Sequence, residues 1–164
     1  MSSKWFDIYS YGSNMAIDRL RLRAPSARLL GAGWLQAHTL RWHKRGRDGS
    51  GKCDALFTGK PEDILWGAVF RIKACDRLSL DQAEHLGIGY QIRVVEVNLA
   101  DGPRKALMYA AIQIQPKLRP FNWYRAYVAR GARELALPPA YIQRIEAVDV
   151  IQDPDHERAA LHDS

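Results

Sequence analysis

The sequence predicts an α+β fold in which a small, curled or closed β-sheet carries a few helices on its outside. Segments that alternate like strands outnumber segments with helical periodicity. Short turns between neighbouring strands outnumber the long helical crossovers that parallel strands require. Gly31 and Gly33 fall inside an apolar strand segment, where glycine favours a bend or a bulge. These features together indicate a sheet that bends back on itself.

The expected strands are short apolar or alternating segments bounded by turn residues. The strongest signal is at residues 65–72, which are apolar, β-branched and aromatic with polar ends. Asp101-Gly102 marks a hairpin turn between two other strands. We expect strands at residues 5–11, 27–36, 39–43, 53–58, 65–72, 90–99 and 106–114.

Four short helices are expected between and after these strands. Residues 78–87 carry the clearest signals, because Ser79 as N-cap and Gln82 three residues later fit a capping box. Gly87 suits the C′ position of the same helix. The other helices are expected from Met15 to about Arg21, from Asn122 to a break at residues 137–139, and over residues 140–148.

Length and composition predict a single domain over residues 1–148, followed by a polar tail over residues 149–164. Five of the last sixteen residues are acidic, and the tail is expected to fray. No apolar run reaches membrane-spanning length and no signal-peptide pattern opens the chain, so we expect a cytoplasmic protein without a membrane partner. Cys53 and Cys75 form no C-x-x-C pair and are expected to be reduced thiols in or near the core.

The basic character of the chain raises the question of a nucleic-acid partner. The formal net charge is +6 and the pI is about 9.5, with basic residues concentrated at 19–23 and 41–47. The sequence lacks a zinc-finger spacing, an aromatic RNA-binding signature and a recognition helix. We therefore expect no nucleic-acid partner but a solvated basic loop near a site for anionic small molecules. A polyanion binder that uses residues 19–47 is the less favoured alternative.

The turn Tyr11-Gly12-Ser13-Asn14-Met15 is the first candidate for a ligand site. A strand that runs into a glycine-containing turn at a helix start directs several backbone N–H groups to one place. Ser13 or Asn14 can act as N-cap, and the helix dipole adds positive potential. The pattern indicates a cradle for a carboxylate or phosphate, and an ordinary strand-to-helix turn is the alternative.

Glu84 is the candidate general acid or base. It lies on the short predicted helix among apolar residues and is expected to project from an apolar surface, where a carboxyl group suits proton transfer near neutral pH. The alternative is an ordinary solvent-facing glutamate. Asp81, one turn earlier, either shares the site or stabilises the helix start. His85 follows Glu84 directly and points about 100° away on a helix, so the two form a poor relay pair.

Tyrosines gather near the predicted site, although most buried tyrosines are core residues with a satisfied hydroxyl group. One of them lining a polar pocket is expected, but not all. The five are Tyr9, Tyr11, Tyr90, Tyr124 and Tyr127.

No motif for a metal or a nucleotide cofactor is present in the sequence. His38 and His43 flank a predicted strand without metal-ligand spacing, and neither a P-loop nor a dinucleotide-binding glycine pattern occurs. Ser13 does not lie in a nucleophile elbow. We therefore expect a site that works without cofactor or metal.

Four segments in order resemble the γ-glutamylcyclotransferase family, which includes the AIG2-like proteins. The resemblance covers residues 7–148. The segments are Tyr11-Gly12-Ser13-Asn14-Met15, Leu65-Trp66-Gly67-Ala68-Val69-Phe70, Leu80-Asp81-Gln82-Ala83-Glu84 followed by Gly89-Tyr90, and Trp123-Tyr124 leading to Gly131-Ala132-Arg133 and Leu137-Pro138.

The resemblance implies a small mixed β-barrel flanked by helices, with the pocket at its mouth. It implies that backbone amides of Tyr11, Gly12, Ser13 and Asn14 hold the substrate and that Glu84 is the acid/base. Tyr124 and Tyr90 are expected to line the site.

Two features separate this sequence from family patterns. His85 stands where the family usually has glycine after the glutamate, which bears on the shape of the pocket and on substrate identity. The turn reads YGSN instead of the YGSL of the glutathione-specific branch, so glutathione is a less favoured substrate.

The resulting hypothesis is a cofactor-independent γ-glutamyl cyclotransferase that releases 5-oxoproline and an amine from a γ-glutamyl amino acid or a γ-glutamyl amine. The α-amine of the substrate attacks its own γ-carbonyl group, with Glu84 transferring protons. The alternative of another class is a non-catalytic AIG2-like protein that binds a small molecule. The leaving amine and the oligomeric state stay open at this level.

Overall fold

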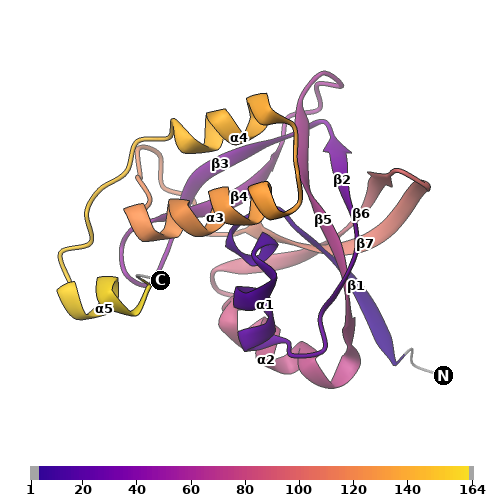
Figure 1. Ribbon diagram of the computed structural model, residues 1–164, viewed down its shortest axis with the longest axis horizontal. Helices are drawn as coiled ribbons and strands as arrows, with labels where there is room; N and C mark the ends of the chain where they lie inside the picture. The colour runs from indigo at the N-terminus through magenta and orange to yellow at the C-terminus, as the bar shows by residue number, and fades with distance from the viewer. Residues whose placement is uncertain (1–3, 163–164) are drawn as a thin grey trace.

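A closed β-barrel forms the centre of the computed structural model, which describes residues 4–162 (Figure 1). Its strands are β1 (Trp5–Ser10), β2 (Arg28–Gln36), β5 (Ile64–Lys73), β6 (Tyr90–Leu99) and β7 (Gly102–Ala111). They adjoin in the order β1-β5-β2-β6-β7, and a parallel pairing between Ile8 and Leu107 closes the barrel. The other neighbours are antiparallel. The predicted α+β barrel with helices outside is thus confirmed.

The bend predicted in the second strand is present. The register of β2 against β5 shifts between Leu29 and Gly31, which marks a β-bulge. Gly33 pairs with Gly67 of β5 on one side and with Leu99 of β6 on the other, and a Cβ there would lie 2.5 Å from the carbonyl oxygen of Asn98. Gly33 therefore permits the close approach of β2 and β6 in the barrel.

A separate hairpin lies beside the barrel. It consists of β3 (His38–Arg45) and β4 (Gly51–Phe57), joined by the basic loop. The buried carboxylate of Asp54 connects it to the barrel by accepting a hydrogen bond from the backbone N–H of Ala111 at 2.8 Å. The second oxygen of Asp54 lies 2.7 Å from Nε2 of His43. His43 therefore helps to hold the hairpin against the barrel.

Helices cover one side and one end of the barrel. They are the 3₁₀ turns η1 (Ser13–Met15) and η2 (Ala74–Asp76) and the α-helices α1 (Ile17–Arg23), α2 (Arg77–Ala83), α3 (Asn122–Glu134), α4 (Pro139–Glu146) and α5 (His156–Leu161). In Figure 1, α3 and α4 lie side by side next to the β3–β4 hairpin, and α1 and α2 lie together below them.

The predicted caps of the early helices are wrong. The N-cap of α1 is Ala16, without a side-chain hydrogen bond, because Ser13 and Asn14 belong to η1 and bind other partners. In α2 the helix begins at Arg77, so Ser79 is inside it. The preceding Asp76 accepts hydrogen bonds from the backbone and side chain of Ser26 instead of capping.

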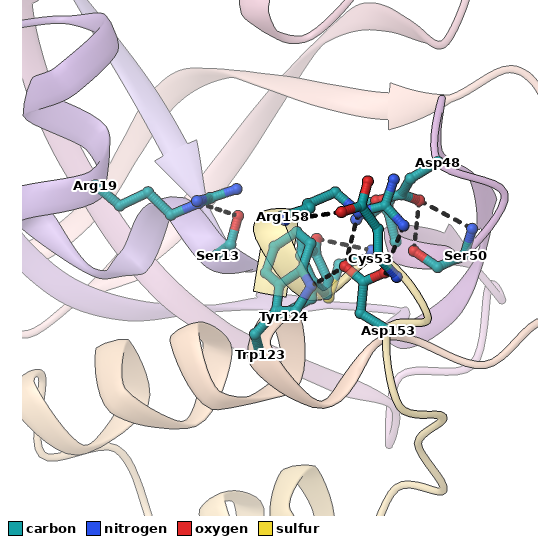
Figure 2. A network of polar contacts seen from close by, with 11 residues as sticks. Ser13, Arg19, Asp48, Ser50, Cys53, Trp123, Tyr124, Asp153 and Arg158 are labelled. Atoms are coloured by element: carbon teal, nitrogen blue, oxygen red, sulfur yellow. Dashed lines mark hydrogen bonds and ion pairs between the residues drawn. The ribbon is translucent and has the colours of Figure 1, made fainter. Parts of the chain in front are cut away.

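The expectation that the tail frays is also wrong for the described residues. Asp153 is buried and accepts two hydrogen bonds from the guanidinium group of Arg158 and one from Nε1 of Trp123 (Figure 2). The ring of His162 stacks on Trp123 with 3.8 Å between centroids. These contacts hold α5 against the start of α3.

The cysteines are unpaired thiols, but only one of them matches the expected burial. Cys53 is buried in β4, whereas Cys75 is exposed in η2.

Packing of α3 on η1 positions the Tyr11–Met15 turn. A Cβ at Gly131 would lie 2.6 Å from Cβ of Met15 and 2.6 Å from the backbone nitrogen of Ala16. Met15 and Ala16 are themselves fully buried. No side chain larger than hydrogen fits at Gly131 without moving the turn.

We expect Gly131→Ala to lower the free energy of unfolding by about 1–3 kcal/mol, because the clash outweighs the higher helix propensity of alanine. Chemical denaturation measures the change. Gly31→Ala is the matched control, since a Cβ at Gly31 meets nothing within 4 Å. Equal stability of the two variants would contradict the close approach of α3 and η1.

We expect Asp153→Asn to raise amide hydrogen exchange in α5, because Asn replaces an oxygen that faces Arg158 with a donor. The bonds from Arg158 and Trp123 hold the pKa of Asp153 well below its usual range. The stability this group contributes is therefore complete above about pH 4 and is lost as the pH falls through the lower folded-state value. Exposed Asp149→Asn is the control. Unchanged exchange in α5 would show that Asp153 does not hold it.

Candidate active site

A small cavity of about 50 Å³, open to solvent, lies where the Tyr11–Asn14 turn, β4, α2 and α3 meet. All of the residues singled out from the sequence line it, namely Tyr11, Gly12, Ser13, Asn14, Glu84, Tyr90 and Tyr124. Tyr9, Ser10, Cys53 and Tyr109 complete the lining. The tertiary structure thus brings six separate parts of the chain to one place.

The turn offers unused backbone donors to this cavity. The N–H groups of Gly12, Ser13 and Asn14 have no hydrogen-bond acceptor among residues 4–162. The packing around this glycine is tight, because a Cβ at Gly12 would lie 3.0 Å from Cβ of Cys53 and 3.6 Å from the hydroxyl oxygen of Tyr124. Such a run of unpaired N–H groups suits a carboxylate or a developing oxyanion.

Glu84 enters the cavity from the C-terminal end of α2. Its side chain is 15% exposed, and Oε1 accepts a hydrogen bond of 2.7 Å from Nδ2 of Asn14. Nη1 of Arg23 donates to Oδ1 of Asn14 at 2.8 Å and lies 3.7 Å from Oε1 of Glu84. The expected apolar surface around Glu84 is therefore wrong: the carboxylate has an amide and a guanidinium group beside it. Oε2 has no donor among the described residues.

The side chain of Asn14 thus forms contacts with Glu84 and Arg23 that the sequence did not indicate. Its amide carries a hydrogen bond from Arg23 on one side and donates to Glu84 on the other. This chain of two bonds fixes the orientation of both the amide and the carboxylate.

The hydroxyl groups of three tyrosines in the lining form hydrogen bonds with backbone atoms of the protein. Tyr11 donates to the carbonyl oxygen of Tyr109, and Tyr90 donates to that of Cys53 at 2.8 Å. The hydroxyl oxygen of Tyr124 accepts the backbone N–H of Cys53 at 3.1 Å. Burial raises the pKa of Tyr11, Tyr90 and Tyr124 well above 10, so these groups stay protonated at neutral pH. These three side chains therefore form a rigid part of the cavity lining.

More of the five tyrosines line the cavity than the one expected, although not all five do. Tyr9, Tyr11, Tyr90 and Tyr124 line it, whereas Tyr127 does not. Tyr109 lines it too, although it was not singled out from the sequence.

Cys53 and Tyr109 are the lining residues with the clearest chemistry that the sequence did not reveal. The Tyr109 hydroxyl donates to Asp81, which also lies 3.5 Å from Nε of Arg77. Asp81 therefore holds the hydroxyl group of the lining residue Tyr109 and does not itself line the cavity. Burial raises the pKa of the Cys53 thiol far above its usual value, so it stays protonated. The alternation of buried and exposed residues along β4 and β7 was the only signal in the sequence for these two residues. It does not indicate which face of each strand lies towards α2.

Cationic side chains contact residues that line the cavity. Nε of Arg19 donates to Oγ of Ser13 at 3.2 Å, and Nζ of Lys52 lies 4.4 Å from the ring centroid of Tyr124. Lys44 is buried with its ammonium group 4.8 Å from the ring of Tyr90. Burial lowers the pKa of both lysines. The site therefore favours an anionic ligand.

Two negative findings concern the described part of the chain. Residues 4–162 hold no group of three or more His, Cys, Asp or Glu side chains placed to bind a metal ion. Within the same range, no helix has the length and hydropathy of a membrane span.

Comparison with known proteins identifies the family. A model of the AIG2-like family matches residues 64–145, which is half of the 164-residue chain. The chain belongs to the AIG2-like family. The match includes α2 with Glu84, the barrel strands β5 to β7 and most of α3 and α4.

The mouse and human relatives of this chain are both named gamma-glutamylcyclotransferase. The chain is 27% identical over 156 residues to the mouse protein named gamma-glutamylcyclotransferase, covering 88% of this chain and 79% of the relative. The human protein of that name is 27% identical over 150 residues with the same coverage. A solved structure titled gamma-glutamyl cyclotransferase superposes with a TM-score of 0.85 at 23% identity, over 96% of this chain and 98% of the other. That structural likeness shows a shared fold.

His85 of this AIG2-like protein ends α2 in an unusual conformation. Its φ is 55°, in the left-handed region, and its N–H donates to the carbonyl oxygen of Gln82 while that of Leu86 donates to Asp81. This pair of bonds is a Schellman motif with His85 at C′, so the prediction of Gly87 for that position is wrong. The imidazole does not line the cavity. His85 therefore affects the backbone after Glu84 more than the shape of the pocket.

We expect His85→Gly to raise the free energy of unfolding by about 0.5–1 kcal/mol, because glycine adopts positive φ without strain but gains entropy when unfolded. Thermal and chemical denaturation measure this change. His85→Ala is the control, since it removes the imidazole and keeps a Cβ. If His85→Ala stabilises as much as His85→Gly, the backbone is not strained at this residue.

Proposed function

We propose that the protein is a γ-glutamyl cyclotransferase that converts a γ-glutamyl amino acid or γ-glutamyl amine into 5-oxoproline and a free amine. One observation carries the proposal: Glu84, oriented by Asn14 and Arg23, faces the same cavity as the unpaired N–H groups of the Gly12–Asn14 turn. The names of the mouse and human relatives support it.

Recognition of the γ-glutamyl group follows from the distribution of charge. The substrate brings an α-carboxylate and an α-ammonium group on one carbon. In the proposed complex the N–H groups of Gly12, Ser13 and Asn14 bind an oxygen of the substrate, either of the carboxylate or of the γ-carbonyl group. The free Oε2 of Glu84 faces the ammonium group.

Ring closure exchanges one C–N bond for another and moves two protons from the attacking nitrogen to the departing nitrogen. Glu84 takes the first proton from the α-ammonium group, and the resulting amine attacks the γ-carbonyl carbon and closes the five-membered ring. The bond to the departing nitrogen breaks as Glu84 returns this proton to it. The ring nitrogen then gives up its second proton through Glu84 to the freed amine, which leaves as an ammonium ion. Atoms and charges balance without water or a second substrate.

Positioning supplies much of the catalysis in this scheme. Nucleophile and electrophile belong to the same molecule, and well-oriented intramolecular reactions gain on the order of 7–11 kcal/mol. The tyrosine wall and the close packing at Gly12 keep the cavity rigid enough to hold the reactive conformation. The buried, protonated Cys53 is unsuited to a covalent route.

We expect Glu84→Gln to lower 5-oxoproline release on the order of 10²–10⁴-fold, the usual contribution of general acid–base catalysis. The amide keeps the size of the side chain and an acceptor for Asn14 but cannot transfer the proton. The assay incubates the protein with a panel of γ-glutamyl amino acids and amines and quantifies 5-oxoproline.

Glu96→Gln, on the exposed face of β6, is the matched control and should retain full activity. Undiminished turnover by Glu84→Gln would refute the assigned role. A wild-type protein that binds members of the panel without releasing 5-oxoproline would point to a binding function instead.

A further inference from the structure

We propose that Lys44, Arg47 and His85 form a second ligand site, which binds a phosphate group, either free or carried by a small molecule. The site is a hollow of about 240 Å³ between the end of β3 and the loop that joins α2 to β6. The side chains that line this basic hollow are Lys44, Arg45, Arg47, His85, Ile88 and Gln113. They are distinct from the residues that line the cavity with Glu84. Phosphate binding there does not require the proposed cyclotransferase activity.

A β-bulge in β3 accompanies the burial of Lys44. The register of β3 against β4 shifts between Arg41 and Lys44, where two residues of β3 oppose Cys53 alone. Such a bulge re-aims the side chains beside it. Lys44 is only 6% exposed, and a Cβ at Gly89 would lie 2.9 Å from its ammonium nitrogen. One lysine of the basic run at residues 41–47 is therefore buried next to the α2–β6 loop.

The ammonium group of Lys44 has no anionic partner. Among residues 4–162 it has neither a hydrogen-bond acceptor nor a carboxylate within ion-pair distance, and it rests 4.8 Å from the ring centroid of Tyr90. Burial lowers the pKa of Lys44, the charge of Glu84 opposes this shift, and the charge of Arg47 adds to it. Since a buried donor without an acceptor is destabilising, a ligand that supplies acceptors to Lys44 is favoured.

The charged groups that line the basic hollow are cationic. The guanidinium groups of Arg45 and Arg47 have no hydrogen-bond or ion-pair partner among the described residues. Within residues 4–162, no Asp or Glu side chain lines the hollow. The carboxylate of Asp48, in the loop after Arg47, pairs with Lys52 at 3.0 Å. An anion bound in the hollow therefore relieves repulsion among its cations.

His85 contributes a strained backbone and a ring without a partner. Its φ of 55° lies in the left-handed region, which residues other than glycine adopt only with strain. Neither ring nitrogen has a hydrogen-bond partner among residues 4–162. Strain of this kind clusters at ligand sites. A role of the imidazole as a donor to the bound anion accounts for a residue other than glycine at this position.

These donors suit a phosphate group better than a carboxylate. A phosphate monoester carries a charge of about −1.5 to −2 at pH 7 and three strong acceptor oxygens. Its oxygens can therefore meet an ammonium group, a guanidinium group and an imidazole at once. A carboxylate offers one charge and two oxygens. The exposed side chain of Ile88 gives the rest of the ligand an apolar surface to lie on.

The test uses inorganic phosphate as the probe and calorimetry at constant ionic strength as the measurement. We expect saturable one-to-one binding by the wild-type protein. Lys44→Gln should weaken it about 10-fold or more, the usual loss for a buried hydrogen bond to a charged group. Arg47→Gln and His85→Gly should each weaken it about 3-fold or more, because these side chains are more exposed. Absence of saturable binding by the wild-type protein would refute the site and leave the cyclotransferase function standing.

Two variants separate a built site from folding and from diffuse charge. His85→Gly is expected to be more stable than the wild-type protein, so weaker binding by this variant cannot come from unfolding. Arg41→Gln is the matched control, since Arg41 is an exposed residue of β3 in the same basic run and does not line the hollow. We expect it to keep the wild-type affinity. If it weakens binding as much as Arg47→Gln, diffuse positive charge attracts the anion and the site is refuted.

Backbone amide chemical shifts locate the bound anion. Titration with inorganic phosphate should move the signals of Arg47, His85 and Gly89 more than those of Ser13 and Asn14. The opposite pattern would place the phosphate in the cavity and overturn the second site.

Phenyl phosphate distinguishes the two sources of the phosphate group. Tighter binding of phenyl phosphate than of inorganic phosphate would assign a phosphate monoester as the ligand, and weaker binding would assign free phosphate. In both cases Lys44→Gln must weaken the binding. Undiminished affinity of Lys44→Gln for both compounds would overturn the proposal.

Discussion

The packing of the Gly12–Ala16 backbone between the β3–β4 hairpin and α3 is the constraint on which the site depends. On one side Gly12 faces Cys53 and Tyr124, and on the other Gly131 allows α3 to touch Met15 and Ala16. Interiors this dense transmit small displacements instead of absorbing them. The turn is therefore held in one conformation, and the unpaired N–H groups at the start of η1 stay in place.

The polar groups around this turn divide into two kinds: tyrosine hydroxyl groups that are hydrogen-bonded within the protein, and a carboxylate that keeps one oxygen without a donor. Tyr11, Tyr90 and Tyr124 use their hydroxyl groups on backbone atoms, which removes them from proton transfer near neutral pH. The one carboxylate of the lining is Glu84, with one oxygen held by Asn14 and one without a donor. A wall of fixed neutral groups around a single carboxylate gives a site in which the position of the proton is well defined.

The cationic side chains next to the cavity repel one another, and an anionic ligand can offset this repulsion. Arg19, Arg23 and Lys44 act electrostatically on Glu84, and burial lowers the pKa of Arg19 and Lys44. Among residues 4–162 neither Arg19 nor Lys44 forms an ion pair; the rings of Tyr127 and Tyr90 stabilise them by cation–π contacts. Rings in place of carboxylates leave the positive potential of these two groups available to an anion, whereas a protein ion pair would cancel it. The docked C-terminal segment contributes by covering the outer face of Trp123.

The sequence by itself determined the order of strands and helices, the presence of the turn and the family resemblance. Alternation and turn residues are local signals, so β6 at Tyr90–Leu99 was predicted with its observed bounds. The family motifs then indicated which side chains share a cavity, because such motifs record packing that periodicity does not.

Only the tertiary structure decided what surrounds each group. Asn14 binds Glu84 across 70 residues, and Trp123 binds Asp153 across 30, distances over which no local pattern acts. Competition for side chains explains two of the wrong predictions: Ser13 and Asn14 looked like helix caps, but Ser13 binds Arg19 and Asn14 binds Glu84 and Arg23. His85 was visible as a departure from the family, whereas its positive φ follows from how α2 must end to join β6. Local chemistry set the elements, and long-range contacts set the site.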